Sequence, residues 1–338
     1  MPRYRPFPTP EKYLVPHDTR GYAFVRNQHM KWGERNVFFN ELGVQDDPIG
    51  SDRNIDILAV GDSFTIGTGL DIEQSWPEQL EELLNQDSKD GKRKRVLNAG
   101  VPGYSIRQIR LQAEELLLKE KLLPKKIIVG LYTSRYWRVQ NPYVLHHGMI
   151  VMQSKIPSMK ILQNGYLTSS FRIPWIRQLD FWFAENFHLG AYTLSLSVIT
   201  KNYVLGILQP TGGWRTEAEN TGDLERMNES ENVGSFREKL QPLILEVTEI
   251  IYLTQQIGIP LYILLVNEQE KDGTFAEHEK AYNQIIKELD GQDGVTVIDP
   301  LPALEATAAG LPIMRLEEDH HWSSLAHQIV AKELKKAL

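Results

Sequence analysis

The chain has 338 residues, of which 41% are hydrophobic and 24% charged, fractions typical of a folded globular protein. Lys and Arg number 37 against 44 Asp and Glu, a net charge of -7, and no basic stripe runs along the chain, so nucleic acid is not an expected partner. The chain has no cysteine, which excludes disulfides and thiolate catalysis, and no run of eighteen apolar residues, so we expect no transmembrane segment.

Residues 1–54 are rich in proline and aromatic side chains and show little periodicity, which predicts an extended N-terminal arm packed on the core. The first residues lack the apolar stretch of a secretory signal. We therefore expect a cytoplasmic chain by default, whereas a chain whose leader had been removed would be exported or periplasmic. The sequence does not indicate an oligomeric state.

From residue 55 to the end, short apolar runs alternate with helical periodicity. Five runs predict strands, at residues 55–60, 96–98, 127–132, 261–266 and 295–298. Ser75–Glu78 and Ser105–Gln108 each have the pattern of a capping box that opens a helix, and Pro77 strengthens the first. The alternation predicts one α/β domain over residues 55–338, with a parallel sheet and helices on both faces.

The stretch at residues 138–232 interrupts this rhythm. It contains an aromatic group from Trp175 to Phe187, followed by a glycine and proline break at Pro210–Gly213. We expect a mostly helical insertion or lid, whose aromatic rings would shield an intermediate, stack on a sugar ring or simply pack on the core.

Ser63 lies just past the first predicted strand, in Gly61-Asp62-Ser63-Phe64, where ligands bind in open α/β sheets. A serine at such a place also commonly forms a turn or caps a helix. Near the other end of the chain, Asp319 stands two residues before His321. Serine becomes a nucleophile when an imidazole takes its proton, and the imidazole needs an acid that orients it, so the two segments together predict nucleophilic catalysis.

Three segments resemble, in order and spacing, the first, second and fifth conserved blocks of the SGNH (GDSL-type) hydrolases. They are Gly61–Phe64, Asn98–Tyr104 and Asp319–Trp322. The resemblance implies the fold of that family, a three-layer, flavodoxin-like, five-stranded parallel sheet, and carboxylic ester hydrolysis without a cofactor.

The resemblance also implies the roles of single residues. Ser63 would attack the acyl carbon, with its own N–H and that of Gly103 forming part of the oxyanion hole, and His321, preferred over His320, would be the base. The orienting acid would be Asp319, with Glu318 as the alternative.

The third block departs from the family pattern, which ends a strand with Gly-x-Asn-Asp and uses the asparagine as the third oxyanion donor. Here the strand runs into Thr133-Ser134-Arg135, so the position falls on Ser134 or, in another count, on Arg135; Asn141 follows a few residues later. Losing one such donor costs about a hundred- to a thousandfold in turnover. A slow hydrolase, an acyl transfer in which Arg135 binds an anionic substrate, and a decayed enzyme all fit this departure.

The histidines allow one further interpretation, a metal site formed by His320, His321 and His327. Adjacent histidines turn to one ion with difficulty and no acidic motif accompanies them, so we expect no metal. Three functions then remain. The first is hydrolysis of a small-molecule or glycan ester such as an O-acyl carbohydrate, the second is O-acyl transfer to a polysaccharide, and the third is a catalytically inert binding module on the same fold.

Overall fold

The computed structural model describes residues 13–32, 35–50, 53–87, 93–146, 149–153, 159–161, 167–169, 233–292, 294–317 and 319–338. These residues belong to two compact units. The larger unit comprises residues 13–145 and 233–338, and it contains every residue of the candidate site that the structure describes. The described residues of the smaller unit begin at residue 146 and include short strands.

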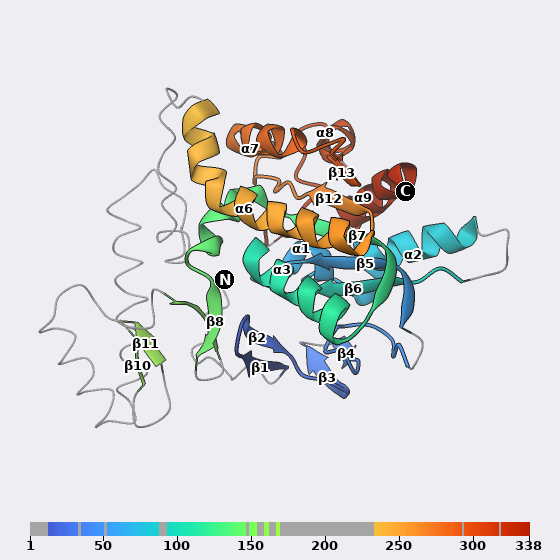
Figure 1. Ribbon diagram of the computed structural model, residues 1–338. Helices are drawn as coiled ribbons and strands as arrows, with labels where there is room; N and C mark the ends of the chain where they lie inside the picture. Colours follow the sequence, from blue (N-terminus) through green and yellow to red (C-terminus); the bar gives the residue numbers. More distant parts are fainter. Residues whose placement is uncertain are drawn as a thin grey trace, which may run out of the picture. The chain divides into compact units, whose positions relative to one another are not determined.

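A five-stranded parallel sheet forms the centre of the larger unit (Figure 1). Its strands are β5 (Asn54–Gly61), β6 (Val96–Gly100), β7 (Leu123–Leu131), β12 (Leu261–Leu265) and β13 (Val295–Ile298). They lie in the order β6-β5-β7-β12-β13, and each neighbouring pair is parallel. Numbered along the chain this is the flavodoxin-like order 2-1-3-4-5. The predicted fold class is therefore confirmed, and all five predicted strands are present.

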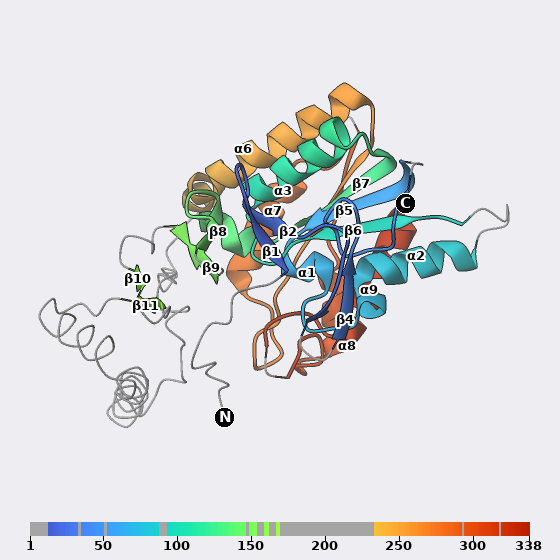
Figure 2. The same ribbon diagram turned by 90° about the horizontal axis from the view of Figure 1, so that it is seen from below.

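Helices cover both faces of this sheet, since Figure 2 shows α3 and α6 on one side and α2 and α9 on the other. The longer helices are α2 (Trp76–Gln86), α3 (Ile106–Glu114), α6 (Val233–Ile257), α7 (Glu277–Lys287), α8 (Leu301–Ala308) and α9 (Ser324–Ala337). The short ones are α1 (Ser63–Ile66), the 3-10 helices η1 (Ile72–Gln74) and η3 (Thr133–Val139), and a π-helical turn, η2 (Glu115–Lys119). Side chains of α2, α8 and α9 pack with one face of the strands in a single buried cluster.

The two predicted capping boxes have different outcomes. At α3 the box forms, because Gln108 N donates to Ser105 Oγ and Ser105 N donates to Gln108 Oε1. At α2, Ser75 is the N-cap residue but its side chain makes no capping hydrogen bond. Its hydroxyl instead accepts a bond of 3.3 Å from Asn98 Nδ2 on β6, so this predicted box was wrong. The Ser75 hydroxyl, which the local pattern predicts to cap the helix, binds the buried Asn98 side chain of the sheet instead.

The described part of the N-terminal arm consists of two β-hairpins and a segment that binds the sheet. The hairpins pair β1 (Leu14–His17) with β2 (Gly21–Phe24) and β3 (Gln28–Trp32) with β4 (Arg35–Phe39). Beyond them, Asp46 Oδ2 accepts a hydrogen bond of 3.0 Å from Asn98 N, and Arg95 Nη2 donates one of 2.7 Å to Asp47 O. These bonds join the arm to β6.

The predicted insertion lies largely outside the described residues. Within it the structure describes β8 (Tyr143–His146), β9 (Met149–Met152), β10 (Met159–Ile161) and β11 (Leu167–Ser169), the last two as an antiparallel pair. The aromatic residues from Trp175 to Phe187 lie within residues 170–232, outside the described part of the chain. Its helical character and the division into arm, hydrolase domain and insertion stay predictions.

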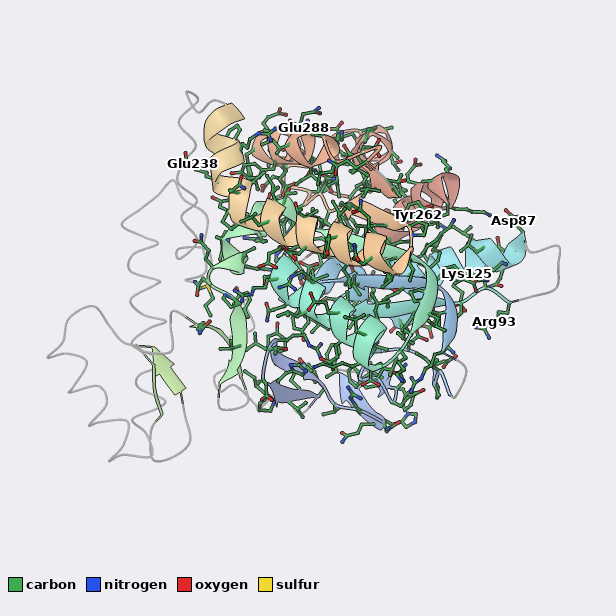
Figure 3. All side chains as sticks on the ribbon, in the orientation of Figure 1. Asp87, Arg93, Lys125, Glu238, Tyr262 and Glu288 are labelled. Carbon is green, nitrogen blue, oxygen red and sulfur yellow. The ribbon has the colours of Figure 1, made fainter. Side chains whose placement is uncertain are left out.

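The described helices include none with the length and apolar character that a bilayer crossing requires. Charged side chains such as Asp87, Arg93 and Glu288 are more than half exposed, at 71%, 77% and 53% (Figure 3).

Three glycines let α1 pack closely on the carboxyl ends of the central strands. They are Gly61 on β5, Gly100 on β6 and Gly130 on β7. A Cβ on Gly61 or Gly130 would lie 1.9 or 2.4 Å from Thr65 Oγ1, and one on Gly100 would lie 2.3 Å from the backbone N of Ile66. Only hydrogen atoms fit at these three places, so the glycines set how near α1 lies to the sheet.

We expect Gly130→Ala to lower the free energy of unfolding by about 1–3 kcal/mol, the usual cost of overpacking a core. Adding Thr65→Ala should restore most of this loss, because it removes the clashing hydroxyl, which is buried without a hydrogen-bond partner. Gly100→Ala is the matched comparison, since it meets backbone and Thr65→Ala should not rescue it. Urea unfolding of the four variants measures these differences, and equal rescue of both alanines would contradict this account of the packing.

Candidate active site

Ser63 is the first residue of α1, immediately after the carboxyl end of the central strand β5. Asp62 caps this helix, because its side chain accepts a hydrogen bond of 3.0 Å from Phe64 N. Ser63 itself is 9% exposed. The first N–H groups of a helix have no partner within it, and among the described residues no acceptor binds the N–H of Ser63. The hydroxyl and a free N–H of one residue therefore meet at the edge of the sheet.

A tight turn at residues 101–104 follows β6 at the same edge. Tyr104 N donates to Val101 O at 3.3 Å, and Gly103 has a φ of +80°. A proline at the second position and a positive φ at the third define a type II turn, which explains the glycine. Within the described part of the chain, the Gly103 N–H donates to no protein acceptor. It is a second free N–H at the carboxyl edge.

His321 lies in the loop between α8 and α9, and this loop is fixed by Trp322. The Trp322 side chain is fully buried, and its Nε1 donates a hydrogen bond of 2.6 Å to Asn267 O, at the end of β12. The ring of His321 then lies 5.1 Å from the ring of Phe64, between centroids. The fold thus brings His321 next to the residue that follows Ser63. No hydrogen bond among the described residues joins Ser63 to His321 in this structure.

Asp319 is the acid in contact with His321. His321 Nδ1 lies 2.9 Å from Asp319 Oδ1, although the ring N–H is not aimed at that oxygen. Burial by itself raises the pKa of Asp319, but contact with His321 and the charge of His320 outweigh it and hold that pKa well below its usual range. Catalytic hydrogen bonds are often poorly aligned until substrate binds, so this contact is compatible with the expected pair, and the roles of base and orienting acid stay predictions. Glu318, the alternative acid, lies outside the described residues.

The neighbouring histidines differ from His321 in their surroundings. His320 is 40% exposed against 12% for His321, and burial together with the charge of His321 lowers the pKa of His320 to about 4. His327 lies in the core, where its Nδ1 accepts a hydrogen bond of 3.0 Å from Trp76 N. Asp319, His320 and His321 offer donor atoms that lie within 4.8 Å of one another. These include the base and acid just described, so the three residues do not form a separate site.

The two predicted replacements for the third oxyanion donor both contact acidic side chains. Ser134 Oγ and Glu279 Oε1 of α7 form a hydrogen bond of 2.8 Å. Arg135 Nη2 lies 3.4 Å from Glu268 Oε2, just after β12, and its guanidinium carbon is 5.3 Å above the ring of Tyr132. The structure therefore places Ser134 against α7 and Arg135 against the segment after β12. Either assignment as an oxyanion donor stays a prediction, as does Asn141.

A chain of buried hydrogen bonds ties this region to the loop that carries His321. Thr133 Oγ1 donates to Asn283 Oδ1 at 2.8 Å, and Asn283 Nδ2 donates to Asn267 Oδ1 at 2.6 Å. Trp322 binds the backbone oxygen of the same Asn267. Buried networks in which each polar group has a partner rigidify a structure. The end of β7, helix α7 and the loop that carries His321 are therefore held in one arrangement.

Arg138 is a residue of the site that the sequence analysis does not select. Its Nη1 lies 3.6 Å from Asp62 Oδ2, and its guanidinium carbon lies 5.7 and 5.3 Å from the ring centroids of Trp137 and Tyr143. Burial raises the pKa of Asp62, and the charge of Arg138 opposes that shift. The charge of Arg138 therefore favours the carboxylate form of Asp62, the residue that caps α1. The sequence signal for Arg138 is its spacing, because it lies three residues, or one turn of η3, after Arg135.

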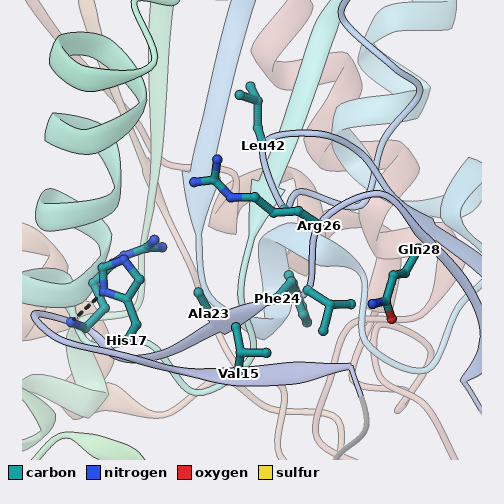
Figure 4. Close-up of a pocket in the computed structure, with 10 residues that line it drawn as sticks. Val15, His17, Ala23, Phe24, Arg26, Gln28 and Leu42 are labelled. Atoms are coloured by element: carbon teal, nitrogen blue, oxygen red, sulfur yellow. Dashed lines mark hydrogen bonds between the residues drawn. The ribbon is translucent and has the colours of Figure 1, made fainter.

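Two cavities in the described part of the chain are lined by residues other than Ser63. One, of about 10 Å³, is lined by Asp62, Arg135 and Arg138 among others and has room for about one water molecule. The other, of about 240 Å³, lies on the β1–β2 hairpin (Figure 4). His17, Arg20 and Arg26 line it, and all three lie within 3.4 Å of the Glu115 carboxylate. Its cationic groups already have a protein partner, so we do not assign it to the active site.

Glu268 and Glu279 form a buried acid pair behind the site. Burial, together with the charge of Glu279, raises the pKa of Glu268 to about 9, and burial raises that of Glu279 to about 7 although Ser134 and Glu268 N bind its oxygens. Arg135, Glu270, Arg315 and Asp319 are the other charged groups acting on the pair. Both glutamates hold protons more tightly in the folded chain than in the unfolded one.

We therefore expect this pair to make the protein less stable as the pH rises. Where the folded state binds more protons, the free energy of unfolding falls with pH, here from about 4.5 until Glu279 and then Glu268 have ionised near 7 and 9. Glu268→Gln should flatten the decrease in melting temperature between pH 6 and pH 9. Glu238→Gln, at an exposed position of α6 (Figure 3), is the matched control. Identical pH profiles for the two variants would contradict the assignment.

Comparisons with known proteins give a structural likeness and no sequence match. No family profile matches the chain, and no curated protein does. One similar solved structure is a putative lipolytic protein of the G-D-S-L family from Desulfitobacterium hafniense, at 12% identity and a TM-score of 0.43, covering 85% of this chain and 100% of the other. A second is TesA, at 13% identity and 0.43, covering 84% and 97%. A third is a mutant of an acetylxylan esterase from Geobacillus stearothermophilus, at 14% identity and 0.45, covering 85% and 94%. The solved structures that resemble this chain thus include GDSL-type lipolytic proteins and esterases.

Proposed function

We propose that this chain is a serine ester hydrolase of the SGNH (GDSL) type, working through an acyl-Ser63 intermediate. The observation that carries the proposal is a pair of backbone N–H groups, those of Ser63 and Gly103, that have no acceptor among the described residues and lie at the edge of the sheet that carries Ser63. Two such donors are what a tetrahedral oxyanion requires. The contact of His321 with Asp319, beside Phe64, supplies a base at the same edge.

The proposed reaction has two steps. In the first, Ser63 Oγ attacks the acyl carbon while His321 takes the hydroxyl proton, and the carbonyl oxygen becomes an oxyanion held by the two N–H groups. The intermediate collapses, the ester C–O bond breaks, and the alcohol leaves with the proton from His321. In the second, water attacks the acyl-serine, His321 takes a proton from the water, and the acid is released as Ser63 recovers its hydrogen. Asp319 orients the imidazole and stabilises its charged form throughout.

The proposed substrate is an ester of a small polar alcohol, such as an O-acyl group on a carbohydrate. This class rests on the resemblance of the three sequence blocks. With Ser134 bonded to Glu279, two backbone donors are available without the usual asparagine. We therefore expect turnover about a hundred- to a thousandfold below that of a hydrolase with a complete oxyanion hole.

A fluorophosphonate probe tests the proposal on the intact chain. We expect it to form one adduct, which mass spectrometry should locate on Ser63, and unfolded protein should not react. Absence of labelling in the folded protein would reject acyl-enzyme chemistry and favour the inert binding module. If Ser63 is labelled, the products formed from an acylated glycan distinguish the remaining candidates, since free acid indicates hydrolysis and a newly acylated acceptor indicates transfer.

A further inference from the structure

The hydroxyl of Tyr22, on the N-terminal hairpin, binds the turn that carries Gly103. It donates a hydrogen bond of 2.6 Å to Pro102 O. Tyr22 is fully buried, and its hydroxyl would lie 3.0 Å from a Cβ placed on Gly103. Burial raises the pKa of Tyr22 well above its ordinary value, so the phenol stays protonated and remains a donor. Tyr22 is distant in sequence from the three segments that resemble the family blocks, yet it binds the peptide that carries the Gly103 N–H.

The bond to Pro102 O determines which way the Gly103 N–H points. The oxygen of Pro102 and the N–H of Gly103 belong to one peptide, which is trans and planar, so they point in opposite directions. A donor on the oxygen side therefore directs the N–H to the other side. A bond that holds Pro102 O in place therefore also holds the Gly103 N–H in place.

The peptide needs such a bond because a Pro-Gly turn has two arrangements. Type I and type II turns differ mainly by a rotation of the central peptide, which here is the one between Pro102 and Gly103. Proline is compatible with the second position of both types, and glycine adopts either sign of φ at the third at little cost. The sequence of the turn therefore favours the type II orientation of the N–H but leaves the type I orientation accessible. The observed turn, with φ of +80° at Gly103, is the one in which Tyr22 reaches the oxygen.

Tyr22 is itself held by several contacts with the segment after β6. Tyr104 Oη donates a hydrogen bond of 2.5 Å to Tyr22 O, and the two rings meet edge to face at 5.1 Å. Arg20 Nη1 donates to the hydroxyl of Tyr104 at 3.2 Å, and Gln108 Nε2 donates to Arg20 O at 2.7 Å. The hairpin is therefore anchored to the last residue of the turn and to α3, and these contacts define the position of the Tyr22 hydroxyl.

We infer that Tyr22 is a positioning residue that orients the Gly103 N–H toward the oxyanion, and that the β1–β2 hairpin is in this way a working part of the active site. The inference rests on the proposed function, in which the Gly103 N–H is an oxyanion donor. Tyr22 acts through the Pro102–Gly103 peptide and requires no contact with substrate.

The test is Tyr22→Phe, which keeps the ring and removes only the donor. We expect kcat for p-nitrophenyl acetate to fall about 10- to 100-fold, because a turn that samples both orientations loses part of one oxyanion donor, whose complete loss costs about 10²–10³. KM should change less than about threefold, and the rate of phosphonylation by the fluorophosphonate should fall with kcat, since its adduct uses the same donors. Tyr104→Phe, which removes the bond to Tyr22 O and the bond from Arg20 Nη1 but leaves the Tyr22 hydroxyl in place, should cause a smaller loss of the same kind.

Tyr262→Phe is the matched control, because Tyr262 lies near the amino end of β12, at the opposite edge of the sheet (Figure 3). It should leave kcat unchanged, and melting temperatures should show that the variants are folded. Wild-type activity together with a Tyr22→Phe kcat within twofold of it would overturn the inference and leave the proposed function standing. An unreactive wild-type Ser63 would overturn both. A loss expressed in KM with kcat unchanged would mean that Tyr22 shapes the substrate pocket, and it too would overturn the inference.

Discussion

Replacing Ser63 by alanine is expected to lower kcat for ester hydrolysis by at least about 10⁴-fold, because removal of the nucleophile leaves only binding and the oxyanion donors. The fold should survive, since Ser63 makes no side-chain hydrogen bond among the described residues and Asp62 still caps α1. Hydrolysis of p-nitrophenyl acetate and fluorophosphonate labelling, measured on the same preparation, provide the readout. Both should be lost together.

Thr248→Ala is the control for this variant. Thr248 is an exposed residue of α6 whose hydroxyl bonds only the backbone oxygen of Ile244, so its loss should leave kcat unchanged. A Ser63→Ala protein that keeps more than a tenth of the wild-type kcat would show that the reaction does not pass through this serine. The free N–H groups at the edge of the sheet would then need another explanation.

The second large effect concerns two adjacent histidines. We expect His321→Gln to lower kcat by at least about 10⁴-fold, as removal of a catalytic base does, and His320→Gln to change it less than about tenfold. The reason is their different placement. His321 is 12% exposed, lies beside Phe64 and is in contact with Asp319, whereas His320 is 40% exposed and stacks on His321 at 4.4 Å.

The pair of glutamine variants is its own control, because the two positions share one loop and one kind of substitution. If His320→Gln proved the more damaging change, the base would be reassigned to His320. If both variants stayed active, the proposed chemistry would fail.

The candidate site is assembled from segments that are far apart in the sequence and end at one edge of the sheet. The carboxyl ends of parallel strands meet at one edge, which is why open α/β sheets bind their ligands there. Ser63 follows β5, Gly103 follows β6, η3 follows β7, and His321 precedes α9. The N-terminal hairpin adds a fifth segment through Tyr22. We therefore expect truncation of the arm to affect catalysis as well as stability.

The fold class was predictable from the sequence, because apolar residues recur with a different period in buried strands and in helices. All five strands are present as predicted, and most of their side chains are apolar and buried, as expected for strands covered on both faces. The sequence also nominated Ser63, Gly103, Asp319 and His321, through the resemblance of three segments to conserved blocks of a known family. The Ser105 capping box was predictable for a similar reason, as a local pattern with a local partner.

Only the tertiary structure decided which polar groups meet. Ser75 lost its predicted capping role to Asn98, Ser134 bonds Glu279, and Arg138 lies against Asp62, in each case through a partner from another element. The direction of the Gly103 N–H belongs to the same class, since a Pro-Gly turn permits two orientations and the hydroxyl of Tyr22 selects one. A hydrogen bond depends on distances of a few tenths of an ångström between distant segments. Periodicity and motif spacing carry no such information, because they describe each segment alone.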